Sequence, residues 1–271
     1  MIGKWPVTIP ELSGKKRRSA YIYLPNECSK DHDTRYPVLY MFDGHNVFYD
    51  EDATYGKSWG MREYMEKTHT PMIIVAIECN HGKNYARLKE YSPYTFTSGN
   101  FGRITGKGDK YMQWLVNELK PMIDAEYPTL PDREHTFIAG SSMGGLMSLY
   151  AVLAYNSVFS RAACLSPSIW TSPKKLRALV REAEIDPDTV IYMDYGSKEM
   201  DNHDDMLHFY SLMVKELMDR RIHLTSRIIP GGEHCEACWE EQIPFFMNTL
   251  TYTRKQPAPE PAEEEKDDME K

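Results

Sequence analysis

Residues 140–144, Gly-Ser-Ser-Met-Gly, have the types and spacing of a catalytic serine turn. They follow an apolar run over 135–139 and precede a helical pattern over 146–153, so we expect a sharp strand-to-helix turn. The glycines leave the room that such a turn needs. A serine held there projects its hydroxyl above the edge of a sheet. The pattern therefore predicts that Ser142 is a nucleophile.

A nucleophilic serine requires a histidine as base and a carboxylate that orients the histidine. In doubly wound hydrolases these residues come in the order serine, acid, histidine, each on a loop after a strand. His234 lies in a glycine-rich loop just after the predicted strand 223–229 and is the expected base. Glu199, on the loop after the predicted strand 189–193, is the favoured acid. The alternatives near this loop are Asp194 and Asp201.

An acyl-transfer reaction also needs two backbone N–H groups that bind the oxyanion. Met143 follows the nucleophile at the start of a helix, where N–H groups are unpaired, so we expect one donor there. The second donor is expected in the loop after an early strand. That loop contains Asp43-Gly44-His45, in which Gly44 permits close backbone approach and His45 supplies the N–H.

The elements that must position these residues alternate along the chain. Strand-like runs predict strands over 19–24, 37–42, 71–79, 135–141, 162–165, 189–193 and 223–229. Helices are expected over 110–127, from Gly144, from Pro173, over 201–220 with Asp201 or Asn202 as cap, and over 236–249 with Pro244 inside. Such alternation predicts an α/β fold, a doubly wound and mostly parallel sheet with helices on both faces, without a large lid domain.

Composition indicates one domain with a charged tail. The chain has 271 residues, 41% of them hydrophobic, and a net charge of −8. Residues 256–271 are rich in proline and acids and carry −5 of that charge, so we expect a domain over 1–255 and a disordered tail over 256–271. The body is then close to neutral, which gives no reason to expect a nucleic-acid partner. No apolar run approaches a membrane span, so no membrane partner is expected.

The cysteines indicate a reducing compartment. There are five, an odd number, and the first residues lack the pattern of a secretory signal, so we expect reduced thiols and a cytoplasmic protein. Cys235 and Cys238 have the spacing of half a metal site, but a second pair is missing. They are interpreted as buried structural thiols, and no metal site is expected.

Four segments together resemble the putative-esterase family of α/β-hydrolases, which includes esterase D-like, feruloyl, acetylxylan and enterochelin esterases. The matching segments are 36–44, 140–145, 194–199 and 231–239. The resemblance implies Ser142 as nucleophile, Glu199 as acid, His234 as base, His45 and Met143 as oxyanion donors, and no metal or organic cofactor. Many relatives have aspartate as the acid, so glutamate departs from the common pattern.

Substrate contacts are expected from the long segment 80–109 and from loops near the serine. Arg87 and Tyr91 are predicted to line a cleft, Trp170 to wall it and His203 to contact substrate. Aromatic residues suit sugar rings or aromatic acyl groups. We therefore predict a serine carboxylesterase for small or carbohydrate-linked esters, of acetyl or feruloyl type. The alternatives are a siderophore trilactone esterase, an acyltransferase and a non-catalytic binding protein. A homo-oligomer is compatible with the sequence.

Overall fold

The computed structural model describes residues 1–29, 33–199 and 203–252. The predicted tail over 256–271 and the predicted helix caps Asp201 and Asn202 lie outside the described residues.

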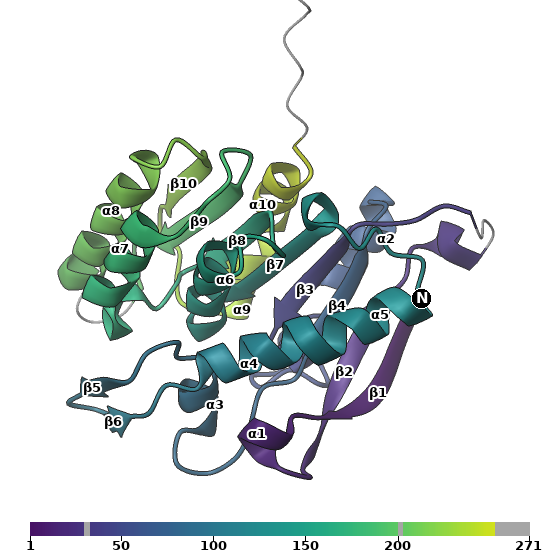
Figure 1. Cartoon of the computed structure of the whole chain (residues 1–271), viewed down its shortest axis with the longest axis horizontal. Helices are drawn as coiled ribbons and strands as arrows, with labels where there is room; N and C mark the ends of the chain where they lie inside the picture. The colour runs from purple at the N-terminus through teal and green to yellow at the C-terminus, as the bar shows by residue number, and fades with distance from the viewer. Residues whose placement is uncertain (30–32, 200–202, 253–271) are drawn as a thin grey trace, which may run out of the picture.

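A twisted sheet forms the centre of the molecule (Figure 1). Among the described residues it has eight strands in the order β1-β2-β4-β3-β7-β8-β9-β10. The six strands from β4 to β10 in this order run parallel, whereas β1 and β2 are antiparallel additions at one edge. The strands are β1 (Ile2–Thr8), β2 (Arg17–Tyr23), β3 (Val38–Phe42), β4 (Ile73–Ile77), β7 (Thr136–Ser141), β8 (Arg161–Leu165), β9 (Val190–Gly196) and β10 (His223–Ile229). The mostly parallel sheet predicted from the alternation is confirmed.

Helices cover both faces of this sheet because its central strands are apolar on both sides. Along β3, Tyr40 and Phe42 belong to one buried cluster, whereas Leu39 and Met41 belong to the other. The first cluster is covered by α4 (Gly108–Trp114), α5 (Lys120–Glu126), α6 (Met143–Ala154), α7 (Pro173–Glu182) and α8 (His203–Met218). The second is covered by α2 (Met61–Thr68), α9 (Glu236–Glu240) and α10 (Ile243–Leu250).

Proline modifies two of the predicted helices. The helix expected over 110–127 consists of α4, a π-helical turn (Leu115–Leu119) and α5. Pro121 has no N–H for the Asn117 carbonyl and its ring crowds that oxygen, which accounts for the wider turn before it. The single helix predicted over 236–249 is wrong. It divides into α9 and α10 because Pro244 lies in the first turn of α10, where its missing N–H costs nothing.

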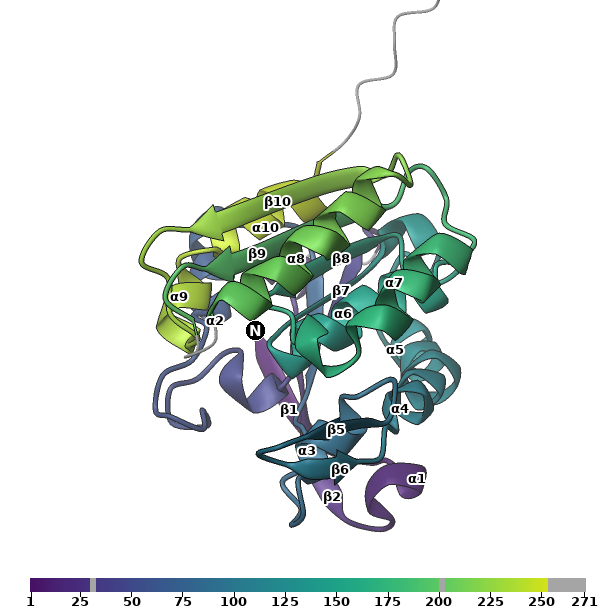
Figure 2. The same ribbon diagram turned by 90° about the vertical axis from the view of Figure 1, so that its left-hand side faces the viewer.

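The segment expected to be a long loop, 80–109, contains three short elements. They are α3 (Ala86–Glu90) and a hairpin of β5 (Phe96–Ser98) and β6 (Gly102–Ile104). Figures 1 and 2 show this hairpin apart from the main sheet, next to α3 and α4. The sequence also did not reveal β1, α2 or the short α1 (Pro10–Ser13). No large lid domain is present among the described residues, as predicted.

Candidate active site

The proposed catalytic residues lie on loops that leave the same edge of the sheet. β7, β8, β9 and β10 are parallel neighbours, so their carboxyl ends meet at one side. Ser142 follows β7, Ser166 follows β8, Glu199 lies beyond β9 and His234 lies beyond β10. Ligand sites of open α/β sheets lie at this edge.

Ser142 occupies a strained turn between β7 and α6. Its φ of 57° and ψ of −119° are unusual for a residue with a side chain. The Ser142 N–H donates to the Leu165 carbonyl at 2.9 Å, and the Ser142 carbonyl accepts from Leu146 N–H at 2.9 Å and Ser168 N–H at 3.0 Å. These bonds to β8, α6 and the loop after β8 hold the strained conformation in place.

The first glycine of the motif is required by the sharpness of the turn. A Cβ on Gly140 would lie 2.7 Å from the carbonyl carbon of Gly144. Only glycine therefore fits where the end of β7 meets the start of α6. Met143 begins α6, so its N–H belongs to the first turn and has no acceptor inside the helix. The Ser142 Oγ lies 3.5 Å from Ser168 Oγ.

Glu199 contacts His234. The Glu199 Oε2 lies 2.9 Å from His234 Nδ1, and the glutamate side chain is only 2% exposed. The other oxygen, Oε1, accepts hydrogen bonds from Gly196 N–H at 2.7 Å and from the Ser166 hydroxyl at 2.5 Å. The carboxylate is thus held by three neighbours and faces the histidine.

Trp239 and Ser166 contact this pair of residues. The Trp239 indole N–H donates to Ser166 Oγ at 2.9 Å, so the Ser166 hydroxyl is free to donate to Glu199. The Trp239 ring also packs edge-on against the His234 ring, with 5.1 Å between centroids. Sequence reasoning missed Ser166 in this position. Its place directly after β8, between the loops of Ser142 and Glu199, is the signal that could have found it.

Asp194, an alternative acid in the sequence, makes other contacts. Its Oδ1 accepts from Ser166 N–H at 3.0 Å and its Oδ2 accepts from the Tyr192 hydroxyl at 2.9 Å. Burial raises the pKa of Asp194 to about 7. Asp194 therefore stabilises the loop after β8. The remaining alternative, Asp201, lies outside the described residues.

The loop after β3 lies beside the serine turn, because β3 and β7 are neighbouring strands. A Cβ on Gly44 would lie 2.5 Å from the carbonyl carbon of Ala76, so this loop can approach β4 only with glycine. Gly44 opens a 3-10 turn (Gly44–Asn46), whose first N–H groups, including that of His45, have no acceptor inside the turn. This leaves His45 N–H available as a donor.

Arg87 binds Asp43, the residue before the 3-10 turn. Asp43 has a left-handed φ of 53° and is bound by Arg87 through Nε at 2.7 Å and Nη2 at 2.6 Å. Burial opposes ionisation of Asp43, but the charge of Arg87 outweighs it and holds the pKa of Asp43 below its usual value. The guanidinium that was expected to bind substrate is thus engaged by a neighbouring carboxylate.

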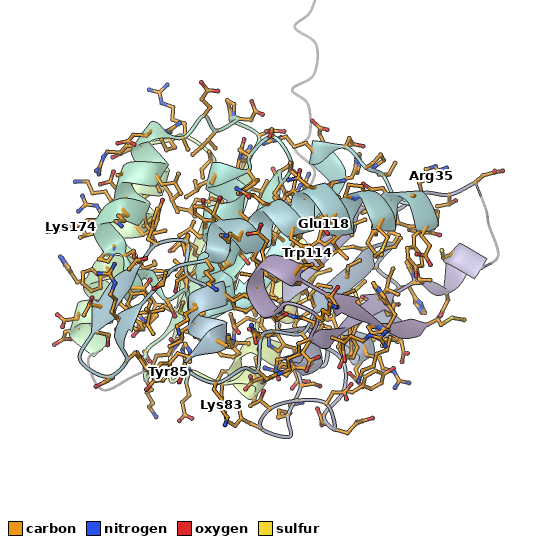
Figure 3. The ribbon with its side chains drawn as sticks, turned by 60° about the horizontal axis from the view of Figure 1, so that its bottom comes forward. Arg35, Lys83, Tyr85, Trp114, Glu118 and Lys174 are labelled. Carbon is orange, nitrogen blue, oxygen red and sulfur yellow. The ribbon has the colours of Figure 1, made fainter. Side chains whose placement is uncertain are left out.

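A cleft of about 520 Å³ contains both Ser142 and His234. Polar and apolar groups share its walls about equally. The walls come mainly from the loops after β3 and β4, and Arg87 contributes to them. Tyr85 also lines the cleft and lies at the surface near Lys83 in Figure 3. The residues that line it and that the sequence did not single out include Asn46, Thr54, Cys79, Asn80 and His81.

Two predicted substrate contacts need correction. Tyr91 is fully buried and does not line the cleft, and its hydroxyl accepts the Asp43 N–H at 3.2 Å. Trp170 also does not line it but packs against Phe96 of β5 and Phe101. The hairpin β5–β6, which the sequence did not reveal, covers this tryptophan. The predicted contact His203 begins α8, and its side chain lies outside the described residues.

The cysteines and histidines were expected to form no metal site. Cys235 and Cys238 are half-buried rather than buried, and Cys238 Sγ accepts the Glu233 N–H at 3.2 Å. A different group, His45, Cys79 and His81, brings one potential ligand atom from each residue within 4.8 Å of the others. The residues come from two separate loops, so their spacing in sequence did not indicate the cluster.

The parallel sheet, the strained serine turn and the loops at the carboxyl edge define an α/β-hydrolase. The family model described as "Putative esterase" matches residues 13–244, and the chain belongs to this family. Membership supports hydrolysis of ester bonds. Within the described parts of the chain, no helix combines the length and apolar character that crossing a membrane requires.

Two relatives in sequence and one solved structure are each less than 30% identical to this chain. The chain is 27% identical to the ferri-bacillibactin esterase BesA of Bacillus subtilis, over 59% of this chain and 58% of BesA. It is 25% identical to the uncharacterized protein YbbA of the same organism, over 66% of this chain and 67% of YbbA. A solved structure of a ferulic acid esterase superposes with a TM-score of 0.70 at 17% identity, over 93% of this chain and 97% of the other. This structural likeness shows the shared fold.

Proposed function

We propose that the chain is a serine carboxylesterase in which Ser142 is the nucleophile, His234 the base and Glu199 the acid. The observation that carries the proposal is the 2.9 Å contact between Glu199 Oε2 and His234 Nδ1 at the cleft that holds Ser142. A carboxylate that accepts the Nδ1 proton leaves Nε2 as the nitrogen that can take a proton from the serine. The strained turn at Ser142 supports the same assignment.

The reaction then follows from the positions of these groups. Ser142 Oγ adds to the ester carbonyl carbon while His234 Nε2 takes its proton. The N–H groups of Met143 and His45 bind the oxyanion of the tetrahedral intermediate. The intermediate expels the alcohol, which receives the proton from His234, and leaves an acyl group on Ser142. Water, deprotonated by His234, attacks this acyl-enzyme; the bond from the acyl carbon to Ser142 Oγ then breaks, His234 returns the proton to that oxygen, and the carboxylic acid leaves.

The proposed substrates are small or carbohydrate-linked esters of acetyl or feruloyl type. The mixed polar and apolar walls of the cleft suit a substrate that carries both hydroxyl groups and an apolar acyl part. A siderophore trilactone is the second candidate, and the similarity to BesA favours it. Hydrolysis rates on acetylated sugars, feruloyl esters, aryl acetates and a trilactone distinguish these classes. Acyl transfer to an added alcohol would instead indicate the acyltransferase alternative. That the protein is cytoplasmic and that it forms a homo-oligomer remain predictions.

A fluorophosphonate probe tests the proposal directly. We expect it to label Ser142 covalently and to abolish ester hydrolysis. Ser142→Ala should abolish labelling and lower kcat by several orders of magnitude. The matched control is Ser141→Ala, which removes the adjacent hydroxyl and should retain labelling. Labelling that survives in Ser142→Ala, or a wild-type chain that resists the probe and hydrolyses none of the esters, would reject the serine mechanism in favour of a binding protein.

A further inference from the structure

A cluster of metal-binding side chains lies in the same cleft, beside the proposed oxyanion loop. His45 comes from the turn after β3, and Cys79 and His81 come from the loop after β4. All three line the cleft that contains Ser142, and their potential ligand atoms lie within 4.8 Å of one another. The His45 and His81 rings are 4.7 Å apart between centroids. Imidazole and thiolate together are the ligands that zinc prefers.

The His45 ring is buried and has one nitrogen without a hydrogen-bond partner among the described residues. It is 6% exposed, and its Nε2 lies 2.9 Å from Thr54 Oγ1. Among the described residues, the buried Nδ1 has no hydrogen-bond partner. An imidazole with one nitrogen held by an oxygen and the other unpaired has the arrangement found in metal-bound histidines.

Metal binding requires the three ligand atoms, now within 4.8 Å of one another, to move closer by at most about 1.5 Å. Bond lengths of about 2.0–2.1 Å to nitrogen and about 2.3 Å to sulfur place tetrahedral ligand atoms about 3.3–3.6 Å apart. Cys79 Sγ and His81 Nε2 are 3.9 Å apart, so they would approach by a few tenths of an ångström. The His81 side chain is 47% exposed and can make this movement.

Charge at the cluster also suits a divalent cation. Glu78 Oε1 lies 3.1 Å from His81 Nε2. This contact would be replaced when Nε2 binds the ion, which leaves the carboxylate close to the cation, and the Cys79 thiol becomes a thiolate when it binds a metal. A buried thiolate is unfavourable alone, but a cation beside it supplies the compensating charge. The thiolate and the Glu78 carboxylate together would balance two positive charges. The nearby Asp43 carboxylate is already neutralised by Arg87.

We propose that His45, Cys79 and His81 bind one thiophilic divalent cation, such as Zn²⁺, with water as the fourth ligand. The ion would occupy part of the substrate cleft and hold the ring of the residue whose N–H is the proposed oxyanion donor. Bound Zn²⁺ therefore inhibits ester hydrolysis reversibly and competes with substrate. This kinetic consequence rests on the proposed function, whereas the binding itself does not.

Co²⁺ is the probe for binding, because a cobalt–thiolate bond gives a charge-transfer absorption band in the near ultraviolet. Metal-free full-length chain titrated with Co²⁺ should show this band, saturating at one ion per chain. Zn²⁺ should displace Co²⁺, since it binds such sites more tightly, whereas Mg²⁺ should not, since it prefers oxygen ligands. Cys79→Ser should abolish the band. His81→Gln, a change at a partly exposed position, should weaken Co²⁺ binding at least about 100-fold, because even outer-sphere partners contribute 10–100-fold.

Matched controls separate this cluster from other thiols and histidines. The double variant Cys235→Ser/Cys238→Ser removes the other cysteine pair and should retain the band. His208→Gln removes an exposed histidine on α8 and should also retain it. A band that survives Cys79→Ser, or that disappears in the Cys235→Ser/Cys238→Ser variant, would overturn the proposed site. Absence of any band in the wild-type chain would overturn it as well.

Kinetics test the consequence separately. Zn²⁺ should raise the KM of wild-type hydrolysis, EDTA should restore it, and the ratio of rates with and without Zn²⁺ should approach one in His81→Gln. Equal inhibition of wild type and His81→Gln would overturn the competitive role. The binding assay contains no substrate and can be run on Ser142→Ala. One Co²⁺ bound by a chain that hydrolyses no ester would therefore reject the proposed function and retain the metal site.

Discussion

Changing Glu199 to glutamine should disable the proposed base while leaving the fold intact. In the structure, Glu199 Oε1 accepts from Gly196 N–H and from the Ser166 hydroxyl, while Oε2 faces His234 Nδ1. The Ser166 oxygen already receives the Trp239 N–H. In the Glu199→Gln variant the amide oxygen must therefore take the place of Oε1 to satisfy the two donors, and the amide NH₂ must face His234.

This orientation reverses the tautomer of His234. An NH₂ group that donates to Nδ1 makes Nδ1 an acceptor, so the ring proton moves to Nε2. A protonated Nε2 cannot take the proton of Ser142. The equivalent acid-to-amide change in a serine protease triad lowers kcat about 10⁴-fold. We expect a loss of the same order here, equivalent to about 5 kcal/mol in the activation barrier.

Steady-state hydrolysis of an aryl acetate near pH 7.5 measures this loss, with circular dichroism to check the fold. The rate of fluorophosphonate labelling should fall in parallel, because it depends on the same activation of Ser142. Asp194→Asn is the control, since Asp194 contacts Ser166 and Tyr192 rather than His234, and its kcat should stay within about tenfold of wild type. A folded Glu199→Gln variant with kcat within tenfold of wild type would refute the assignment of the acid.

Three further changes test the packing around the site. Gly44→Ala would place a methyl group 2.5 Å from the backbone of Ala76, so we expect about 1–3 kcal/mol less stability and a lower kcat as the His45 N–H moves, measured by urea unfolding and kinetics. The pKa of Asp194 is about 7 in the folded chain and about 3.9 in the unfolded chain, so between these pH values only the folded chain keeps this proton. The stability that this group contributes therefore falls as pH rises from about 4 to about 7. In Asp194→Asn the urea midpoint should change less with pH over that range than in the wild-type chain. An equal dependence of the midpoint on pH in both proteins would contradict the raised pKa. Arg18→Met would leave Glu90 buried without the partner that now binds it at 2.5 and 2.9 Å. A loss of about 3–5 kcal/mol is expected, and Arg18→Met/Glu90→Leu should recover most of it; equal stability of the single variant and wild type would contradict a structural role.

Local sequence predicted most strands of the central sheet and the placement of two proposed catalytic residues. The turn at Ser142 needs glycine next to the nucleophile, and that need is visible as a motif between an apolar strand and a helix. His234 lies in the loop after the segment 223–229, which forms β10 over the predicted residues. Periodicity and turn chemistry act over a few neighbouring residues, so they can be read without the fold. They gave no sign of β1 or of the β5–β6 hairpin, whose short or exposed strands lack a strong apolar pattern.

Tertiary structure alone decided which side chains meet. Asp194 lies within β9 and Glu199 lies five residues later, on the loop that follows. Only the tertiary structure turns Glu199 toward His234 and buries Asp194 against Ser166 and Tyr192. Tyr91, at the end of α3, was also expected to line the cleft, but the packing of α3 buries it in the core. The cluster of His45, Cys79 and His81 joins loops that are more than thirty residues apart and adjacent only because β3 and β4 pair. Contacts of this kind depend on strand order and loop direction, which no local pattern in the sequence encodes.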